Sequence, residues 1–394
     1  MDEDNKNINY KALTWLLLLG FGIFSYPFSW FSLGSGNLLL RGFIVFFCVL
    51  IIVLSILKRH KMTVHSTHFI LFVFMLFYSM RLYFDAISGK YNFDMTNDVL
   101  LLRFISMVWI PFLFISLLNI KEIPVKLCQI SLLVICFLAL VNGLISGFGE
   151  RLSGNNILNP ITLGYYAGML LVITFYSIKV LSIPMKNPVN FISVGIGAAV
   201  LALTLSRGAM LSTAIVVFML MRFKGFEKND RSNFGFGLAV FVVWIAIFLS
   251  DTGISTTRMD VNLGSEYSAG EKRVILWYLA FAKIIANPLF GSAVTTEIGY
   301  VHNIYLESIM AVGLCGSALL FYPLWTIKSR FSKKIKLKRH VSCGVYLFVF
   351  HAIASLFTGT IYNSEFLFLT LPMALNSLMQ TNDYSIRSSK GVLS

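Results

Sequence analysis

The chain has 394 residues, of which 57% are hydrophobic and only 13% are charged, and its formal net charge is +14. A soluble domain is excluded, because the hydrophobic residues form runs of about 17–25, each long enough to cross a hydrocarbon core of roughly 30 Å as a helix. In lipid the backbone must satisfy its own hydrogen bonds, so we predict an all-α, polytopic membrane protein. We attribute the positive charge to membrane topology and contact with anionic lipids, and expect no nucleic acid partner.

Twelve transmembrane helices are predicted, forming a single integral membrane domain over residues 1–394. They lie near residues 12–32, 38–57, 67–86, 99–118, 127–147, 161–178, 190–206, 208–221, 233–250, 303–327, 341–360 and 366–380. An even number places both termini on one side. The loops and tails on that side hold about two thirds of the 32 basic residues, which predicts that both termini are cytoplasmic.

Charged residues at the outer ends of these spans are candidates for function, because charge is costly there. Arg81 and Arg103 flank the connection between the third and fourth spans. Arg207 stands in Ser206-Arg207-Gly208, between two short apolar runs, where a bare turn would need no arginine. Gly208 would let another group approach closely. Each arginine can also be explained as an interfacial residue whose charge reaches the lipid headgroups.

One outer loop is long, and we assign residues 251–302 to a periplasmic loop. Ser268-Ala269-Gly270-Glu271 has the pattern of a capping box, which predicts a helix over residues 272–286 that ends at Asn287-Pro288. The helix mixes aromatic and basic residues, as an amphipathic helix on a membrane surface does, although a plain connecting helix fits equally well. Arg273 lies in its first turns, where the guanidinium and free backbone N–H groups can face one anion.

A histidine begins the next span. His302 is the one histidine that we assign to an outer loop, and an imidazole can accept a proton from an attacking hydroxyl near neutral pH. Asn303 can orient a neighbouring group, and Glu307 lies one turn further on the same helix face. Gly313 and Gly316 would offer a small face for helix packing. A lone histidine at a helix end is also commonly structural.

Several kinds of site are disfavoured by what the sequence lacks. We find no Asp-x-Asp pair on the outer side, no Cys/His spacing typical of a metal site, and no glycine loop that would cradle a phosphate. We therefore expect no metal and no cofactor. Two arginines remain as bidentate ligands for a phosphate, and one base remains for a hydroxyl.

Three motifs resemble those of a known family, and they occur along the chain in the order that the family has. His302-Asn303, followed by Gly313-x-x-Gly316, resembles the histidine-led motif of bacterial O-antigen ligases and the related O-antigen polymerases. Ser206-Arg207-Gly208-Ala209 resembles the Ser-Arg-Gly element of that family. The segment from Arg273 to Trp277, with Pro288-Leu289-Phe290-Gly291, resembles its loop helix and the turn that follows. The resemblance covers roughly residues 200–320, and the N-terminal half matches by hydropathy alone.

The resemblance implies a GT-C-like glycosyltransferase of the bacterial inner membrane with a periplasmic active site. The implied donor is an oligosaccharide on undecaprenyl diphosphate, and the reaction is metal-independent and inverts the anomeric centre. By the same resemblance Arg207 and Arg273 bind the diphosphate, and His302 activates the acceptor hydroxyl. Asn303, Glu307, Arg81 and Arg103 are added here as candidates for substrate binding.

The acceptor distinguishes two activities. An O-antigen polymerase joins one lipid-linked glycan to another and can work with a chain-length regulator, whereas a ligase transfers the glycan to lipid A-core. We favour the polymerase, because such polymerases often keep this motif and vary widely elsewhere. A flippase or transporter is a third hypothesis. It would be expected to show internal repeats and polar residues at the membrane midplane, which we do not find in the sequence.

Overall fold

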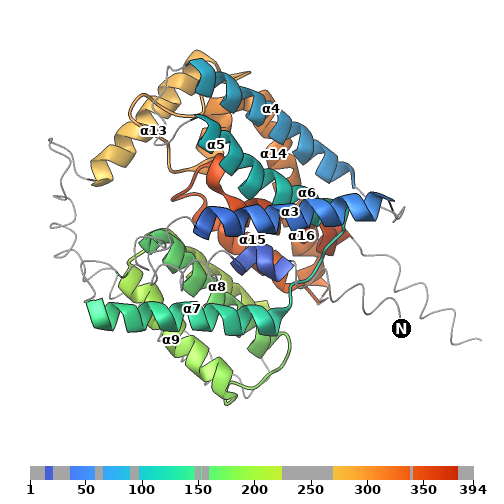
Figure 1. The fold of residues 1–394 in the computed structure, drawn as a ribbon, viewed down its shortest axis with the longest axis vertical. Coiled ribbons are helices and arrows are strands. Elements are labelled where there is room, and N and C mark those ends of the chain that lie inside the picture. Colours follow the sequence, from blue (N-terminus) through green and yellow to red (C-terminus); the bar gives the residue numbers. More distant parts are fainter. Residues whose placement is uncertain are drawn as a thin grey trace, which may run out of the picture.

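The computed structural model describes residues 14–20, 36–57, 65–88, 97–146, 152, 159–223, 269–337 and 340–379 (Figure 1). The described elements are all helices, and no strand occurs among them. In chain order they are η1 (Leu16–Gly20), α3 (Gly36–Leu57), α4 (Ser66–Ser88), α5 (Asn97–Phe104), η2 (Ile105–Trp109), α6 (Ile110–Leu117), α7 (Val125–Ser146), α8 (Pro160–Lys179), α9 (Pro188–Thr204), α10 (Arg207–Phe223), α13 (Ala269–Ala286), α14 (Ile304–Lys336), α15 (Cys343–Ala354), η4 (Ile361–Asn363) and α16 (Glu365–Met379). This confirms the predicted all-α class.

Among the described residues, five helices are long and apolar enough to cross a membrane. They are Ser66–Ser88, Leu100–Leu117, Val125–Ile145, Pro160–Lys179 and Ile304–Lys336. Each predicted span from 38–57 to 208–221, and each of the last three, coincides with a helix. The span predicted at 233–250, most of the one at 12–32, and residues 251–268 of the predicted loop lie outside the described residues. The number of twelve spans therefore stays a prediction.

Two predicted boundaries are wrong. The span predicted at 341–360 ends as a helix at Ala354, because the polar segment Ser355–Ser364 follows, with Gly359 at φ 94°. The span predicted at 303–327 continues as α14 to Lys336, and its last turn carries basic side chains that suit a helix C-terminus. The helix predicted over residues 272–286 is confirmed as α13.

The helices form two packed groups joined by α15 and α16. In Figure 1, α7, α8 and α9 lie together below α15, and α4, α5 and α14 lie above it. α10 packs on both α8 and α15, while α16 packs on α15, α6 and α14. Large fully buried side chains such as Tyr166, Phe350 and Phe368 fill the joined core. This packing brings the starts of α8, α10 and α14 to one end of the bundle, where α13 also lies.

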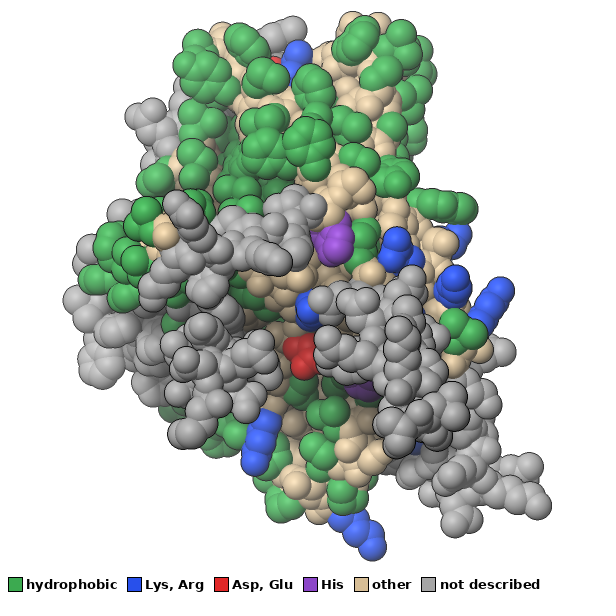
Figure 2. Space-filling model, turned by 90° about the vertical axis from the view of Figure 1, so that its right-hand side faces the viewer, with side chains coloured by type: hydrophobic (Ala, Val, Ile, Leu, Met, Phe, Trp, Pro, Cys, Tyr) green, Lys and Arg blue, Asp and Glu red, His purple; other side chains and the backbone are tan. Residues whose placement is uncertain are grey.

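The opposite end of the bundle is more basic. Figure 2 views the molecule from the right of Figure 1. Lysine and arginine side chains are spread over the middle and lower parts of that face, with one near its top, and the upper part is otherwise mostly hydrophobic. The last turns of α8 and α14 both carry lysines. This distribution is what a cytoplasmic face would require.

Candidate functional site

The first turn of α14 is organised by Asn303. Its side-chain oxygen accepts hydrogen bonds from the backbone N–H groups of Tyr305 and Leu306, both at 3.1 Å, so Asn303 is the N-cap of the helix. Because the side-chain oxygen of Asn303 is used by the cap, a substrate could be bound through its amide nitrogen, and the predicted role in substrate binding stays a prediction.

His302 immediately precedes this cap and is half-buried. Its φ of 57° lies in the left-handed region, a conformation that a non-glycine residue adopts only when its surroundings hold it there. The imidazole lies 4.0 Å from the ring of Tyr300, measured between centroids. The indole N–H of Trp277, on α13, donates to the carbonyl of Val301 at 3.1 Å. The backbone that presents His302 is thus fixed on one side by the cap of α14 and on the other by α13.

A break in α14 joins this helix to α13. Gly313 has φ 68° and ψ −175°, which no α-helix contains, and the helix resumes after it. A side chain on Gly313 would overlap the carbonyl of Leu289, and one on Gly291, at φ 71°, would overlap the backbone of Ala311. Gly313 is therefore required for a bent backbone and a docked turn, rather than for the helix packing that we predicted.

Backbone hydrogen bonds hold the turn in the break. They are Leu314 N–H to Pro288 O at 2.8 Å, Cys315 N–H to Leu289 O at 3.2 Å, and Ser292 N–H to Met310 O at 2.8 Å. The N–H and C=O groups that the break frees from the helix are thereby satisfied inside the protein, as a low-dielectric environment demands. The break also makes α13, which carries Arg273, and the start of α14, which follows His302, one connected unit.

Glu307 is fully buried and holds three elements together. Its Oε1 accepts the hydroxyl of Tyr78 on α4 at 2.5 Å and the backbone N–H of Ile361 in η4 at 3.1 Å. A buried carboxyl is costly unless it receives hydrogen bonds, and these two donors supply them to Oε1, while Oε2 is buried without a partner among the described residues. The structure gives Glu307 a role in fixing the start of α14, whereas the sequence suggested substrate binding.

Arg207 begins α10 at a tight corner and is exposed. Leu205, at φ 52°, turns the chain between α9 and α10. Ser206 lies against Gly164 of α8, where an added Cβ would come within 2.7 Å of the Cβ of Ser206. Gly208 faces Phe357, at 3.2 Å by the same measure. The close approach predicted at Gly208 is confirmed.

Arg273 is exposed on α13, and its charge acts on the hydroxyl of Tyr165, in the second turn of α8. The same hydroxyl shares a hydrogen bond with Thr358. Gly164 touches Ser206, the residue before Arg207, so the start of α8 lies against the start of α10. Arg207 stands at the corner formed by the starts of α8 and α10, and Arg273 lies 66 residues further along the chain (273 − 207), on α13.

The loop 355–364 connects this corner to α14, and sequence reasoning missed it. The carbonyl of Ser355 accepts the N–H of Ile304 at 3.1 Å, at the start of α14. The loop also supplies Phe357 to Gly208, Thr358 to Tyr165 and Ile361 to Glu307. It contains no charged residue that would have drawn attention. The available signal was the run Thr358-Gly359-Thr360, which interrupts an apolar segment.

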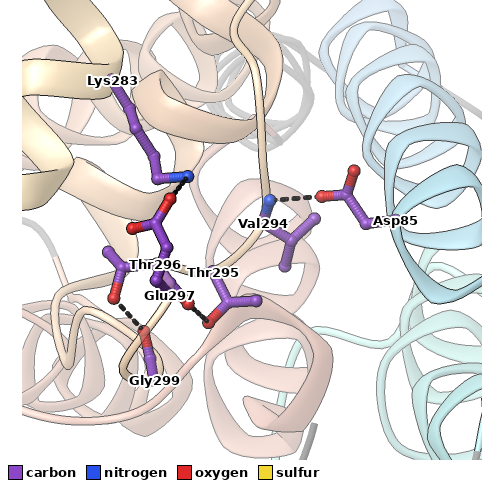
Figure 3. A network of polar contacts seen from close by, with 7 residues as sticks. All are labelled: Asp85, Lys283, Val294, Thr295, Thr296, Glu297 and Gly299. Carbon is purple, nitrogen blue, oxygen red and sulfur yellow. Dashed lines mark hydrogen bonds and ion pairs between the residues drawn. The ribbon is translucent and has the colours of Figure 1, made fainter. Parts of the chain in front are cut away.

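Arg81 is paired within the protein. Its Nε lies 3.2 Å from Oδ1 of Asp85, one turn along α4. The other oxygen, Oδ2, accepts the backbone N–H of Val294 at 2.7 Å, so the pair anchors the segment between α13 and α14 (Figure 3). Lys283, in the last turn of α13, forms an ion pair at 2.7 Å with Glu297 of this segment (Figure 3). Arg81 thus holds structure in the described contacts, and its part in substrate binding stays a prediction.

Arg103 is half-buried on α5, which packs against η4. No contact in the described part of the chain joins its side chain to Arg207, Arg273 or His302. Within the same ranges no three His, Cys, Asp or Glu side chains gather as they would around a metal ion. The described contacts join the start of α10 to α8 and to the loop 355–364, and they join that loop to the start of α14, which follows His302.

Comparison with known proteins gives one match. Residues 192–321 match the family model described as O-antigen ligase, a segment that contains Arg207, Arg273 and His302 but neither Tyr165 nor the loop 355–364. No curated protein sequence matches the chain.

Proposed function

We infer from the match of residues 192–321 to the O-antigen ligase family model that this membrane protein is a glycosyltransferase that acts on lipid-linked glycans. The observation that carries the proposal is that Arg207, Arg273 and His302 all lie within the matched segment. A single membrane domain over residues 1–394 would present them at one end of the bundle.

In the proposed reaction Arg207 and Arg273 hold the diphosphate of an undecaprenyl-linked oligosaccharide. Guanidinium groups grip phosphate oxygens in bidentate pairs and stabilise the negative charge that develops as the diphosphate departs. His302 accepts the proton of the acceptor hydroxyl while that oxygen bonds to the anomeric carbon. The bond from the anomeric carbon to the phosphate oxygen breaks, and its electron pair leaves with the diphosphate. Attack from the opposite face inverts the anomeric centre, and no metal takes part.

The favoured acceptor is a second lipid-linked oligosaccharide, which makes the protein an O-antigen polymerase. The alternative acceptor is lipid A-core, which would make it a ligase. Both reactions use the same three residues, so the acceptor has to be determined by experiment.

A reconstituted assay tests the proposal. Purified protein is given a lipid-diphosphate-linked glycan in the presence of a chelator, either alone or with lipid A-core. Longer lipid-linked glycan without lipid A-core supports the polymerase, and a conjugate formed only with lipid A-core identifies the ligase. If neither product forms while the protein moves the intact donor across a sealed membrane, the protein is a transporter. Activity that requires an added divalent metal would contradict the metal-independent mechanism.

The periplasmic placement of the site can be tested separately. Ala282 on α13 and Ser332 near the end of α14 are both exposed and lie on opposite sides in the proposed topology. In a cysteine-free background, Ala282→Cys should react with an impermeant thiol reagent in spheroplasts, and Ser332→Cys should react only after lysis. The reverse pattern would overturn the topology.

A further inference from the structure

The turn Pro288–Gly291 is docked at a point on α14 whose depth in a membrane follows from the rest of that helix, which is long and apolar enough to span one. Toward the far end of α14, Trp325 is exposed, and the Nζ of Lys328 lies 4.8 Å from the centre of the Trp325 ring. An exposed tryptophan beside the first of several basic residues is typical of a membrane–water interface. From Lys328 back to Leu314 the chain has 14 residues (328 − 314), which span about 21 Å as a helix. A hydrocarbon core is about 30 Å thick, so Leu314 and the turn hydrogen-bonded to it lie about 9 Å inside the opposite boundary, and deeper if the helix is tilted.

The segment around the turn is uncharged and exposes mainly apolar side chains. No charged residue occurs from 284 to 296, and six residues of that stretch are exposed, of which only Asn287 is polar. Leu289 and Phe290 are 54% and 78% exposed, and Leu314, to which the turn is bonded, is 52% exposed. The exposed surface of the turn is therefore continuous with the exposed surface of a membrane-spanning helix. Apolar side chains exposed at this depth fit lipid acyl chains rather than water.

The chain leaves the turn without forming a helix, and this returning part is buried in protein. Residues 293–296 are at most 2% exposed. The N–H of Ser292 donates to the carbonyl of Met310 at 2.8 Å. The N–H of Val294 donates to Oδ2 of Asp85 at 2.7 Å (Figure 3). Irregular backbone occurs at membrane depth only where protein covers it and satisfies its hydrogen bonds, and the returning part meets that condition.

An ion pair closes the uncharged stretch. Lys283 and Glu297 are the charged residues on either side of it, and their side chains are paired at 2.7 Å (Figure 3). The side chain of Glu297 is 57% exposed. Because charge is costly inside hydrocarbon and tolerated at its surface, this pair suits the place where the chain enters and leaves the membrane.

We propose that residues 284–296 form a re-entrant segment, which enters the hydrocarbon core and returns to the same side, with Leu289 and Phe290 against lipid acyl chains. The ion pair that flanks the segment lies at the membrane surface. The break at Gly313 is what allows the turn to dock at this depth. The C-terminal end of α13 is then neither a plain connection nor a helix lying flat on the surface, and it anchors in the membrane the backbone that leads to His302. The proposal does not depend on the proposed reaction.

The test measures the depth of a nitroxide spin label in vesicles of phosphatidylethanolamine and phosphatidylglycerol. Phe290→Cys and Ile298→Cys are made in a Cys315→Ser background, because Cys315 is exposed and the other four cysteines are buried. Phe290 and Ile298 are both apolar and exposed, at 78% and 49%, so Ile298 is the matched control outside the segment. We expect oxygen, which dissolves in hydrocarbon, to relax the label at position 290, and a water-soluble nickel chelate to relax the label at position 298. The label at position 290 should lie about 5–10 Å below the membrane boundary.

Two results with these labels would overturn the proposal. One is a label at position 290 that the chelate reaches as readily as the label at position 298. The other is a label at position 290 that neither reagent reaches, because protein would then cover the turn. Wild-type protein labelled at Cys315 supplies a second measurement if Phe290→Cys does not insert. The N–H of Cys315 donates to the carbonyl of Leu289 at 3.2 Å, so this label should have a similar depth, and its relaxation by the chelate would also overturn the proposal.

Discussion

Two sets of charged residues differ in their surroundings: one set is paired or hydrogen-bonded within the protein, and the other is exposed. On the side of α4, Arg81 is paired with Asp85, and Glu307 receives hydrogen bonds from Tyr78 and Ile361. Arg207, at the corner of α8 and α10, and Arg273, on α13, are both exposed. The first set is engaged in holding helices and loops together, while the second presents charge outward.

The difference teaches how to interpret charge near a membrane helix end. Sequence alone assigns all of these residues to function by default, because charge is costly there. In the structure, Arg81 is paired with a carboxylate, whereas Arg207 and Arg273 are more exposed, and we take this exposure as the criterion for an arginine suited to an anionic ligand. This criterion predicts that substitutions on the two sides will affect different quantities: stability on the side of α4, and substrate binding or turnover at the corner.

The largest effect is expected at His302. General-base catalysis typically contributes about 10²–10⁴-fold, so His302→Ala should lower turnover by that order. Binding of the donor should survive, because it depends on the arginines. Single-turnover rates and donor affinity measured on the same preparation check both points. Unchanged turnover would exclude His302 as the base. Lost affinity for the donor would instead make His302 a donor-binding residue.

The next largest effect is expected from substitutions at Arg207 and Arg273. Arg207→Lys and Arg273→Lys keep the charge but lose the planar fork, and we expect about 10- to 100-fold lower kcat/KM for the donor in each. The corresponding alanine variants should be worse, with normal insertion into the membrane. Full glycan assembly by the double lysine variant would remove the corner from the mechanism.

Glu307 sharpens the comparison. It lies close in sequence to His302, but it belongs with Arg81 and Asp85 to the residues that hold helices and loops together, here called the anchoring set. Glu307→Leu removes both hydrogen bonds, and we expect a loss of about 1–3 kcal/mol in the free energy of unfolding. Activity should fall because the start of α14 moves, and Glu307→Gln, which keeps an acceptor oxygen, should restore part of both. Thermal unfolding and donor kinetics check this. A Glu307→Leu protein of normal stability that fails to bind substrate would instead make Glu307 a ligand-binding residue.

The smallest effect is expected at Arg81, whose ion pair with Asp85 is partly exposed. Arg81→Ala removes an ion pair in which the arginine is 32% exposed, and such pairs contribute roughly 1 kcal/mol or less. Asp85→Leu also removes the acceptor of the Val294 N–H and should lower the melting temperature more. Neither variant should alter donor affinity, as measured by titration. Weaker donor binding in Arg81→Ala at unchanged stability would contradict the division.

The sequence predicts the helical class, the individual helices and the three motif residues, because hydrophobic runs and motif spacing are local features. It predicts α13 through a capping pattern and the Asn-Pro stop. It does not predict that the turn at Pro288–Gly291 inserts into α14 at Gly313, because that contact joins two backbones and leaves no pattern of side chains. The same limit applies to Glu307, whose partner Tyr78 lies 229 residues away.

The central claim is that the diphosphate is held at the corner of Arg207 and Arg273 and not along α4. The most direct measurement is a titration of purified wild type, Arg207→Lys, Arg273→Lys and Arg81→Lys with undecaprenyl diphosphate under identical conditions. We predict at least about tenfold weaker binding for Arg207→Lys and Arg273→Lys, and wild-type affinity for Arg81→Lys. Wild-type affinity in both corner variants, or an equal loss in Arg81→Lys, would contradict the account.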